Sequence, residues 1–181
     1  MQNKLKKILV IGSIESFSLE GMYFRAFKSL KCNVEFFHTY KIRKNLLEKI
    51  LWKYLRFIYF ILIRSKILYK LKSKKNYYDL VVVFKGLYLN KNFLLQCKNT
   101  QVNSKWINIF PDNPFNIKQN EEISSRGVIQ SIEYFDKFFI FSYKILKKLK
   151  KFYLKNNFAY LPFGNDDSYH KKKNNLKKKN L

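Results

Sequence analysis

Short apolar runs alternate with longer stretches in which apolar residues recur at helical spacing, and this pattern predicts the secondary structure. Strands are expected at residues 5–11, 32–38, 79–84, 106–110, 135–141 and 158–161. Helices are expected after Ser18, over 46–63, after Asn90, over 121–132 and over 143–154. The continuous apolar run at 79–84 is typical of a strand that is buried on both faces. The order of elements therefore predicts an α/β fold with a doubly wound, mainly parallel sheet.

Polar residues follow several of these strands, and open α/β sheets bind their ligands at this edge. The residues at the first three strand ends are Gly12, Ser13, Glu15, His38, Lys85 and Gly86. We expect them to open onto one edge, with Glu15 and His38 as candidate bases. The alternative, which position alone favours, is an ordinary strand-to-helix turn at Ser13 and Glu15 and a hydrogen-bonded loop histidine at His38. The loop after the first strand has neither a dinucleotide fingerprint nor a P-loop lysine.

The stretch 106–115 is an apolar strand that runs into Pro-Asp-Asn-Pro. Pro111 and Pro114 fix φ and favour extended geometry before them, so Asp112 and Asn113 should be held in a defined turn. Asp112 is our first choice for a polar active-site residue, and Asn113 is expected beside it. Turn chemistry alone could also place these residue types at the end of a strand, and the sequence leaves that alternative open.

Residues 44–72 form a basic and aromatic helical segment. If residues 46–63 are one helix, a broad apolar face lies opposite three basic residues; the face consists of Leu47, Ile50, Leu51, Tyr54, Ile58, Ile61 and Leu62. Residues 57–63 are apolar around the whole circumference, so they require burial by protein, a partner or lipid. The basic residues Lys49, Lys53 and Arg56 disfavour a transmembrane span. Two explanations for the burial of this segment remain open, namely packing within the protein and contact with a membrane interface.

The composition is strongly basic, with 37 Lys and Arg against 12 Asp and Glu and a net charge of +25. Such charge favours a polyanionic partner, although Lys, Asn, Ile, Phe and Tyr are abundant together, as an AT-rich coding sequence would impose. The aromatic residues fall on apolar faces, which disfavours nucleic-acid binding. Cys32 and Cys97 lack metal-type spacing and no Asp-x-Asp motif follows a strand, so no metal is expected. The amino-terminal apolar run stops at Gly12, too early for a signal peptide, which predicts a cytoplasmic protein, peripheral at the inner face of the membrane if it binds lipid.

Five segments in this order resemble the amino-terminal half of CgeB-like glycosyltransferases. They are Lys-Ile-Leu-Val-Ile-Gly at 7–12, Tyr-Asp-Leu-Val-Val-Val-Phe-Lys-Gly at 78–86, Pro-Asp-Asn-Pro-Phe at 111–115, Phe-Asp-Lys-Phe-Phe-Ile-Phe-Ser at 135–142 and Tyr-Leu-Pro-Phe-Gly-Asn-Asp at 160–166. The resemblance extends to about His170. It implies one Rossmann-like half of a GT-B fold, in which two such domains face each other across a cleft.

By this resemblance, residues 1–168 form the acceptor-side domain, with 44–72 as a helical insertion. Asp112, Glu15 and His38 are the expected catalytic residues, and Gly12, Ser13, Lys85, Gly86, Asn113 and Gly164 are expected to contact substrate. The family's second domain binds the nucleotide-sugar donor, whereas here a Lys- and Asn-rich tail at 169–181 is expected to be disordered.

We therefore expect no cofactor on this domain and little transferase activity without a donor domain, which a separate polypeptide would provide. The expected acceptor is a glycan of the cell envelope or a lipid-linked one. The alternative function is that of a non-catalytic basic protein on an anionic membrane surface.

Overall fold

The computed structural model describes residues 6–13, 18–39, 46–115, 128–155, 157–162 and 164. Its strands form one six-stranded sheet in the order β2-β1-β3-β4-β5-β6. Their bounds are β1 (Lys7–Gly12), β2 (Asn33–His38), β3 (Leu80–Phe84), β4 (Lys105–Phe110), β5 (Lys137–Ile140) and β6 (Phe158–Tyr160). Every neighbouring pair is parallel. The predicted α/β class and parallel sheet are confirmed.

The helices are α1 (Leu19–Ser29), α2 (Leu46–Tyr54), α3 (Arg56–Ser73), α4 (Lys91–Thr100), the 3-10 helix η3 (Ile132–Tyr134) and α6 (Tyr143–Phe152). Two of them begin at the expected caps. The Ser18 hydroxyl accepts a hydrogen bond from the Gly21 amide at 3.1 Å, and the Asn90 side chain accepts one from the Phe93 amide at 2.9 Å. Residues 128–131 are helical before η3, and the rest of the helix expected at 121–132 lies outside the described residues.

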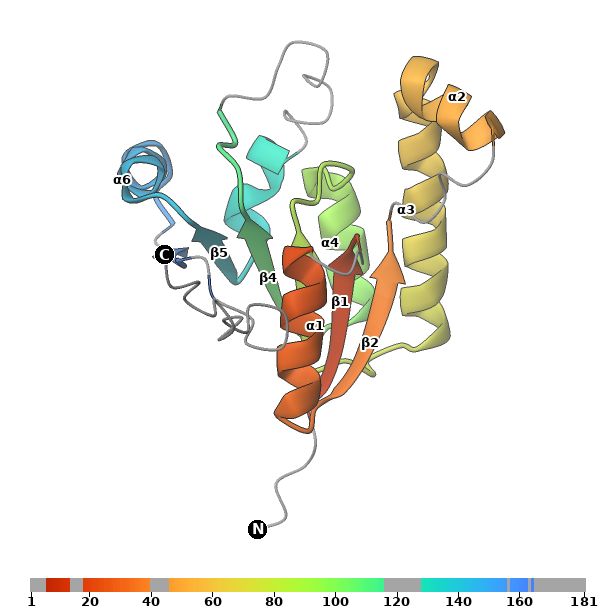
Figure 1. Cartoon of the computed structure of the whole chain (residues 1–181), viewed down its shortest axis with the longest axis horizontal. Helices are drawn as coiled ribbons and strands as arrows, with labels where there is room; N and C mark the ends of the chain where they lie inside the picture. The colour runs from red at the N-terminus through yellow and green to blue at the C-terminus, as the bar shows by residue number, and fades with distance from the viewer. Residues whose placement is uncertain are drawn as a thin grey trace, which may run out of the picture.

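Helices cover both faces of the sheet (Figure 1). Because side chains alternate along a strand, Leu9 and Ile11 enter a large core with α3, α4 and α6, whereas Ile8 and Val10 enter a smaller core with α1. Residues 81–83 of β3 are fully buried, as expected for a strand covered on both sides. The chain goes from β1 outward to β2, then returns to β3 on the other side of β1. The strand order therefore reverses between β1 and β3.

The segment expected as one helix over 46–63 is two helices, so this prediction is wrong. The break lies at Leu55, whose φ of −131° and ψ of 50° are not helical, and α3 continues to Ser73. The side of α3 that packs on the sheet is the stripe Tyr59, Ile63, Ile67 and Leu71. The predicted apolar face is largely exposed instead. Because residues 57–63 are apolar all round, only the stripe that continues beyond Ile63 determines which side packs.

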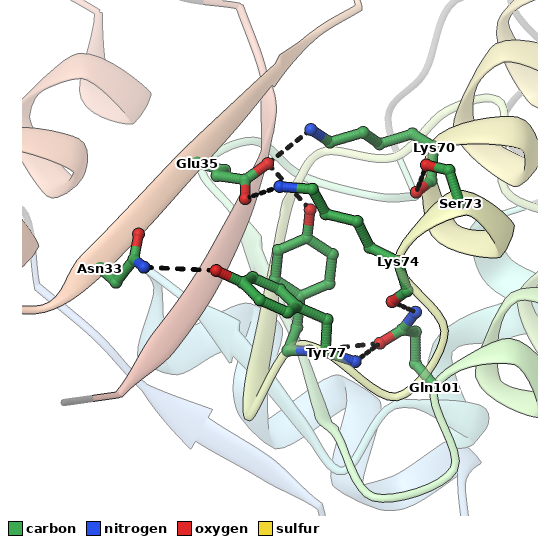
Figure 2. Close-up of polar contacts among 8 residues, drawn as sticks. Asn33, Glu35, Lys70, Ser73, Lys74, Tyr77 and Gln101 are labelled. Carbon is green, nitrogen blue, oxygen red and sulfur yellow. Dashed lines mark hydrogen bonds and ion pairs between the residues drawn. The ribbon is translucent and has the colours of Figure 1, made fainter. Parts of the chain in front are cut away.

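A polar network fixes the end of α3 against β2 (Figure 2). Glu35 of β2 accepts hydrogen bonds from Lys70 at 2.5 Å, from Lys74 and from the Tyr78 hydroxyl at 3.0 Å. Burial by itself would raise the pKa of Glu35, but these hydrogen bonds and the charge of Lys70 outweigh it and lower the pKa to about 2. The Gln101 amide donates to the Lys74 carbonyl at 2.7 Å. The network thus ties α3, β2 and the loop after α4 together.

Across the ranges that the structure describes, no helix has both the length and the apolar character needed to cross a bilayer.

Candidate functional site

The carboxyl ends of β1 and β3 bring several of the predicted residues to one edge of the sheet. Gly12, the last residue of β1, pairs in register with His38 at the end of β2. The Thr39 amide and hydroxyl both donate to the Gly12 carbonyl, at 2.8 and 3.0 Å. After β3, the Lys85 amide donates to the Ile109 carbonyl of β4 at 3.1 Å. This edge includes the point where the strand order reverses, which is where open α/β sheets bind ligands.

An ion pair joins the loops after β3 and β4. The Lys85 ammonium lies 2.7 Å from an Asp112 carboxylate oxygen, and the two side chains are 40% and 58% exposed. An ion pair this exposed contributes at most about 1 kcal/mol to folding. Both groups are accessible to a ligand in solution.

A local hydrogen bond closes the Asp112-Asn113 turn. The Asn113 side-chain oxygen accepts a hydrogen bond from the Phe115 amide at 3.0 Å, and Pro114 is buried. This bond closes the turn locally, so the Asn113 amide oxygen already has a structural role. Asp112 is held beside it with its carboxylate directed at Lys85.

The turn after β3 has an unusual backbone. Lys85 and Gly86 both adopt positive φ, at 57° and 72°. A Cβ placed on Gly86 would lie 2.9 Å from a Val83 methyl group, so glycine is required both by conformation and by space. Lys85 has no such freedom, and this conformation costs a non-glycine residue about 1–2 kcal/mol. Strain of this kind is common at ligand-binding turns.

Asn108 of β4 belongs to the site although the sequence-based selection missed it. It is buried, and its side-chain amide donates to the Lys85 carbonyl at 3.3 Å. Its side-chain oxygen has no hydrogen-bond partner among the residues that the structure describes. The signal was a single polar residue inside the apolar run Trp106–Phe110. Through this hydrogen bond, the Asn108 side chain stabilises the backbone of the Lys85 turn.

Glu20, in the first turn of α1, is a second residue that the selection missed. A Cβ on Gly12 would lie 2.6 Å from the Glu20 Cγ, so the acidic side chain packs directly over Gly12. The signal was an acidic residue in the first turn of the helix that follows the Gly12 loop. The structure thus adds a carboxylate to the edge where the sequence predicted Glu15.

The remaining predicted residues lie at different distances from the Lys85–Asp112 pair. The Ser13 carbonyl accepts a hydrogen bond from the Ser18 hydroxyl at 2.9 Å, which holds the start of α1 at the edge. His38 lies on the outermost strand, with its ring 4.7 Å from that of Phe36. Glu15 lies outside the described residues. Gly164 follows β6, which β4 and β5 separate from β3, and an added Cβ there would meet no atom within 4 Å.

A small apolar hollow lies at the same edge, where β4, β5 and β6 end. Its lining includes Pro111 after β4, Phe141 after β5, Pro162 after β6 and Tyr23 of α1. The edge therefore offers an exposed carboxylate and ammonium next to an apolar surface. The free volume of the hollow is about 10 Å³, roughly that of one water molecule, so it is a shallow apolar surface and not an enclosed cavity.

Among the described residues, no group of three or more His, Cys, Asp or Glu side chains could hold a metal ion. No family model matches the chain, and no curated protein matches it in sequence.

Proposed function

We propose that this chain contains the acceptor-side Rossmann-like domain of a GT-B-type, CgeB-like glycosyltransferase. The observation that carries the proposal is the exposed Lys85–Asp112 pair at the carboxyl edge, next to the reversal of strand order. The five segments that resemble the family support it as well. Three of them contain β1, β3 and β5, a fourth begins at the last residue of β6, and the fifth is the turn after β4, so all five contribute to one edge.

Glycosyl transfer needs an acceptor hydroxyl that is aligned and deprotonated. The hydroxyl oxygen attacks the anomeric carbon, the bond from that carbon to the diphosphate breaks, and the hydroxyl proton passes to a base. In this proposal Asp112 accepts the hydrogen bond of the acceptor hydroxyl and then its proton. Lys85 holds the Asp112 carboxylate in place through their 2.7 Å contact. Glu15 and His38 remain the other candidate bases.

The leaving diphosphate must also be stabilised, which needs positive charge and hydrogen-bond donors on the opposite wall of a cleft. We propose that a second Rossmann-like domain, on the same or another polypeptide, supplies that wall and binds the nucleotide-sugar. The acceptor-side domain then binds no cofactor. By itself it should bind acceptor sugars weakly and turn over no sugar nucleotide.

Saturation-transfer NMR of the purified chain with glucose, galactose, N-acetylglucosamine and their octyl glycosides tests this proposal. We expect at least one sugar to bind, and the signal to disappear in Asp112→Asn and Lys85→Met. Lys105→Met is the matched control, because it removes an exposed lysine at the amino end of β4. The proposal is wrong if no sugar binds, or if the site variants bind as the control does. Turnover of a sugar nucleotide by the purified chain would contradict the proposal that a second domain binds the donor.

A further inference from the structure

Large apolar side chains are exposed on α2 and on the first half of α3. We call them the α2–α3 patch, and it consists of Leu47, Ile50, Tyr54, Phe57, Ile61 and Leu62. Leu47 is 73% exposed, Phe57 62% and Leu62 41%. Single exposed apolar residues are ordinary on a protein surface, whereas several on two consecutive helices are typical of interaction sites.

Packing on the opposite side of α3 fixes this exposure. Ile63, Ile67 and Leu71 are buried in the main core, so a rotation of α3 that hid the patch would expose them. Two hydrogen bonds hold the helix in addition. The Tyr59 hydroxyl donates to the Thr39 carbonyl at 2.8 Å, and the Arg64 guanidinium donates to the Tyr88 carbonyl at 2.7 Å. Turning this helix therefore cannot cover Phe57, Ile61 and Leu62, the α3 part of the patch.

The outward face of α3 changes character along its length. It is apolar at Phe57, Ile61 and Leu62, and further on it becomes mixed, with Ser65, Lys66 and Lys72 exposed beside Tyr69. The apolar half is the one next to α2, at the end of the molecule to which the strands point (Figure 1). The patch therefore lies at the same end of the sheet as Lys85 and Asp112.

The charge around the patch favours an anionic lipid surface over a second copy of the chain as its partner. Residues 41–75 contain twelve Lys and Arg but one acidic residue, Glu48. Lys70 and Lys74 are paired with Glu35, whereas Lys53, Lys66 and Lys72 are exposed. A second copy of the chain docked patch to patch would bring two such segments together and add like-charge repulsion. An anionic lipid surface attracts these lysines and accepts apolar side chains at the depth of its headgroups.

We infer that the α2–α3 patch docks on an anionic membrane surface, with Phe57, Ile61 and Leu62 inserted at headgroup depth and the neighbouring lysines on the lipid headgroups. Docking in this way holds the carboxyl edge of the sheet near the membrane. It does not depend on glycosyl transfer. If the proposed function is also correct, it favours an acceptor that is attached to lipid.

Sedimentation with vesicles tests the inference. The complete chain is mixed with phosphatidylcholine vesicles that contain or lack about a third phosphatidylglycerol, at about 0.05 M and about 0.5 M NaCl. We expect binding to the anionic vesicles that weakens with salt. The double variant Phe57→Gln/Leu62→Gln should lower the partition coefficient about tenfold or more, because two inserted side chains become polar.

The matched control is Leu30→Gln/Leu154→Gln, which replaces two exposed leucines distant from the patch. Since general basic charge would also attract vesicles, the difference between the two double variants is the decisive measurement. Equal binding by both would overturn the inference, as would failure of the unaltered chain to bind anionic vesicles at low salt. A dimer in sedimentation velocity that only Phe57→Gln/Leu62→Gln abolishes, with vesicle binding unchanged, would assign the patch to a second copy instead. Circular dichroism checks that the variants are folded.

Discussion

Replacement of Glu35 by glutamine tests how the long helix α3 is held to the sheet. Glu35 accepts hydrogen bonds from two lysines of α3 and its C-terminal turn and from the Tyr78 hydroxyl. Glutamine has nearly the same shape, so packing is preserved while the negative charge is lost. Lys70 and Lys74 then face each other without their shared counter-charge. We expect the end of α3 to be the part of the fold that loosens.

The pKa of Glu35 sets the magnitude. A fall from the ordinary value of 4.5 to about 2 corresponds to about 3 kcal/mol of stabilisation of the charged form. Lys70 and Lys74 are 30% and 36% exposed, so solvent screens the interaction. After this reduction we expect Glu35→Gln to cost about 1–2 kcal/mol at pH 7. The thermal midpoint should fall by about 2–8 °C.

The pH dependence gives a second measurement with a definite sign. Because the folded-state pKa is lower than the unfolded one, the contribution is complete above about pH 5 and disappears as the pH falls towards 2. Urea unfolding followed by circular dichroism between pH 7 and pH 2 should show this loss in the unaltered chain. The stability of Glu35→Gln should depend less on pH over the same interval.

Glu133→Gln is the control, since it neutralises a carboxylate outside this network. The reasoning would be refuted if Glu35→Gln changed the free energy of unfolding by less than about 0.5 kcal/mol at pH 7, the ordinary range for a surface substitution. An unchanged pH slope would refute it as well. A double-mutant cycle with Lys70→Met would then show whether the two groups interact in solution.

Three further outcomes are expected. Gly86→Ala should destabilise the protein by about 1–3 kcal/mol in urea unfolding, because alanine at a φ of 72° is strained and its Cβ meets Val83; an unchanged midpoint would contradict this. On α3, Ile67→Ala should cost about 2–4 kcal/mol and Leu62→Ala under about 0.5 kcal/mol, since one side chain is buried and the other exposed; equal losses would contradict the assigned faces. Burial raises the pKa of the Cys97 thiol to about 12, so a thiol reagent at neutral pH should modify the half-buried Cys32 first and Cys97 only on unfolding; equal rates would contradict the packing of α4.

Local sequence patterns are sufficient to predict the strands, their parallel arrangement and the caps of α1 and α4. These features depend on local spacing and on residue types such as Ser18 and Asn90, whose side chains satisfy the first amides of a helix. The edge at which Gly12, Lys85 and Asp112 gather also followed, because parallel strands all end at the same side.

Other features depend on contacts between segments that are distant in the chain. The side of α3 that packs could not be derived from residues 57–63, which are apolar all round, and only contact with the sheet selected Ile63 and Ile67 over Phe57 and Leu62. The Lys85–Asp112 pair joins positions 27 residues apart in the chain, so no local pattern specifies it. The roles of Asn108 and Glu20 were also beyond the sequence. The positions of Asn108 and Glu20 depend on the order of the strands in the sheet. That order follows from burial of the whole sheet and not from any single segment.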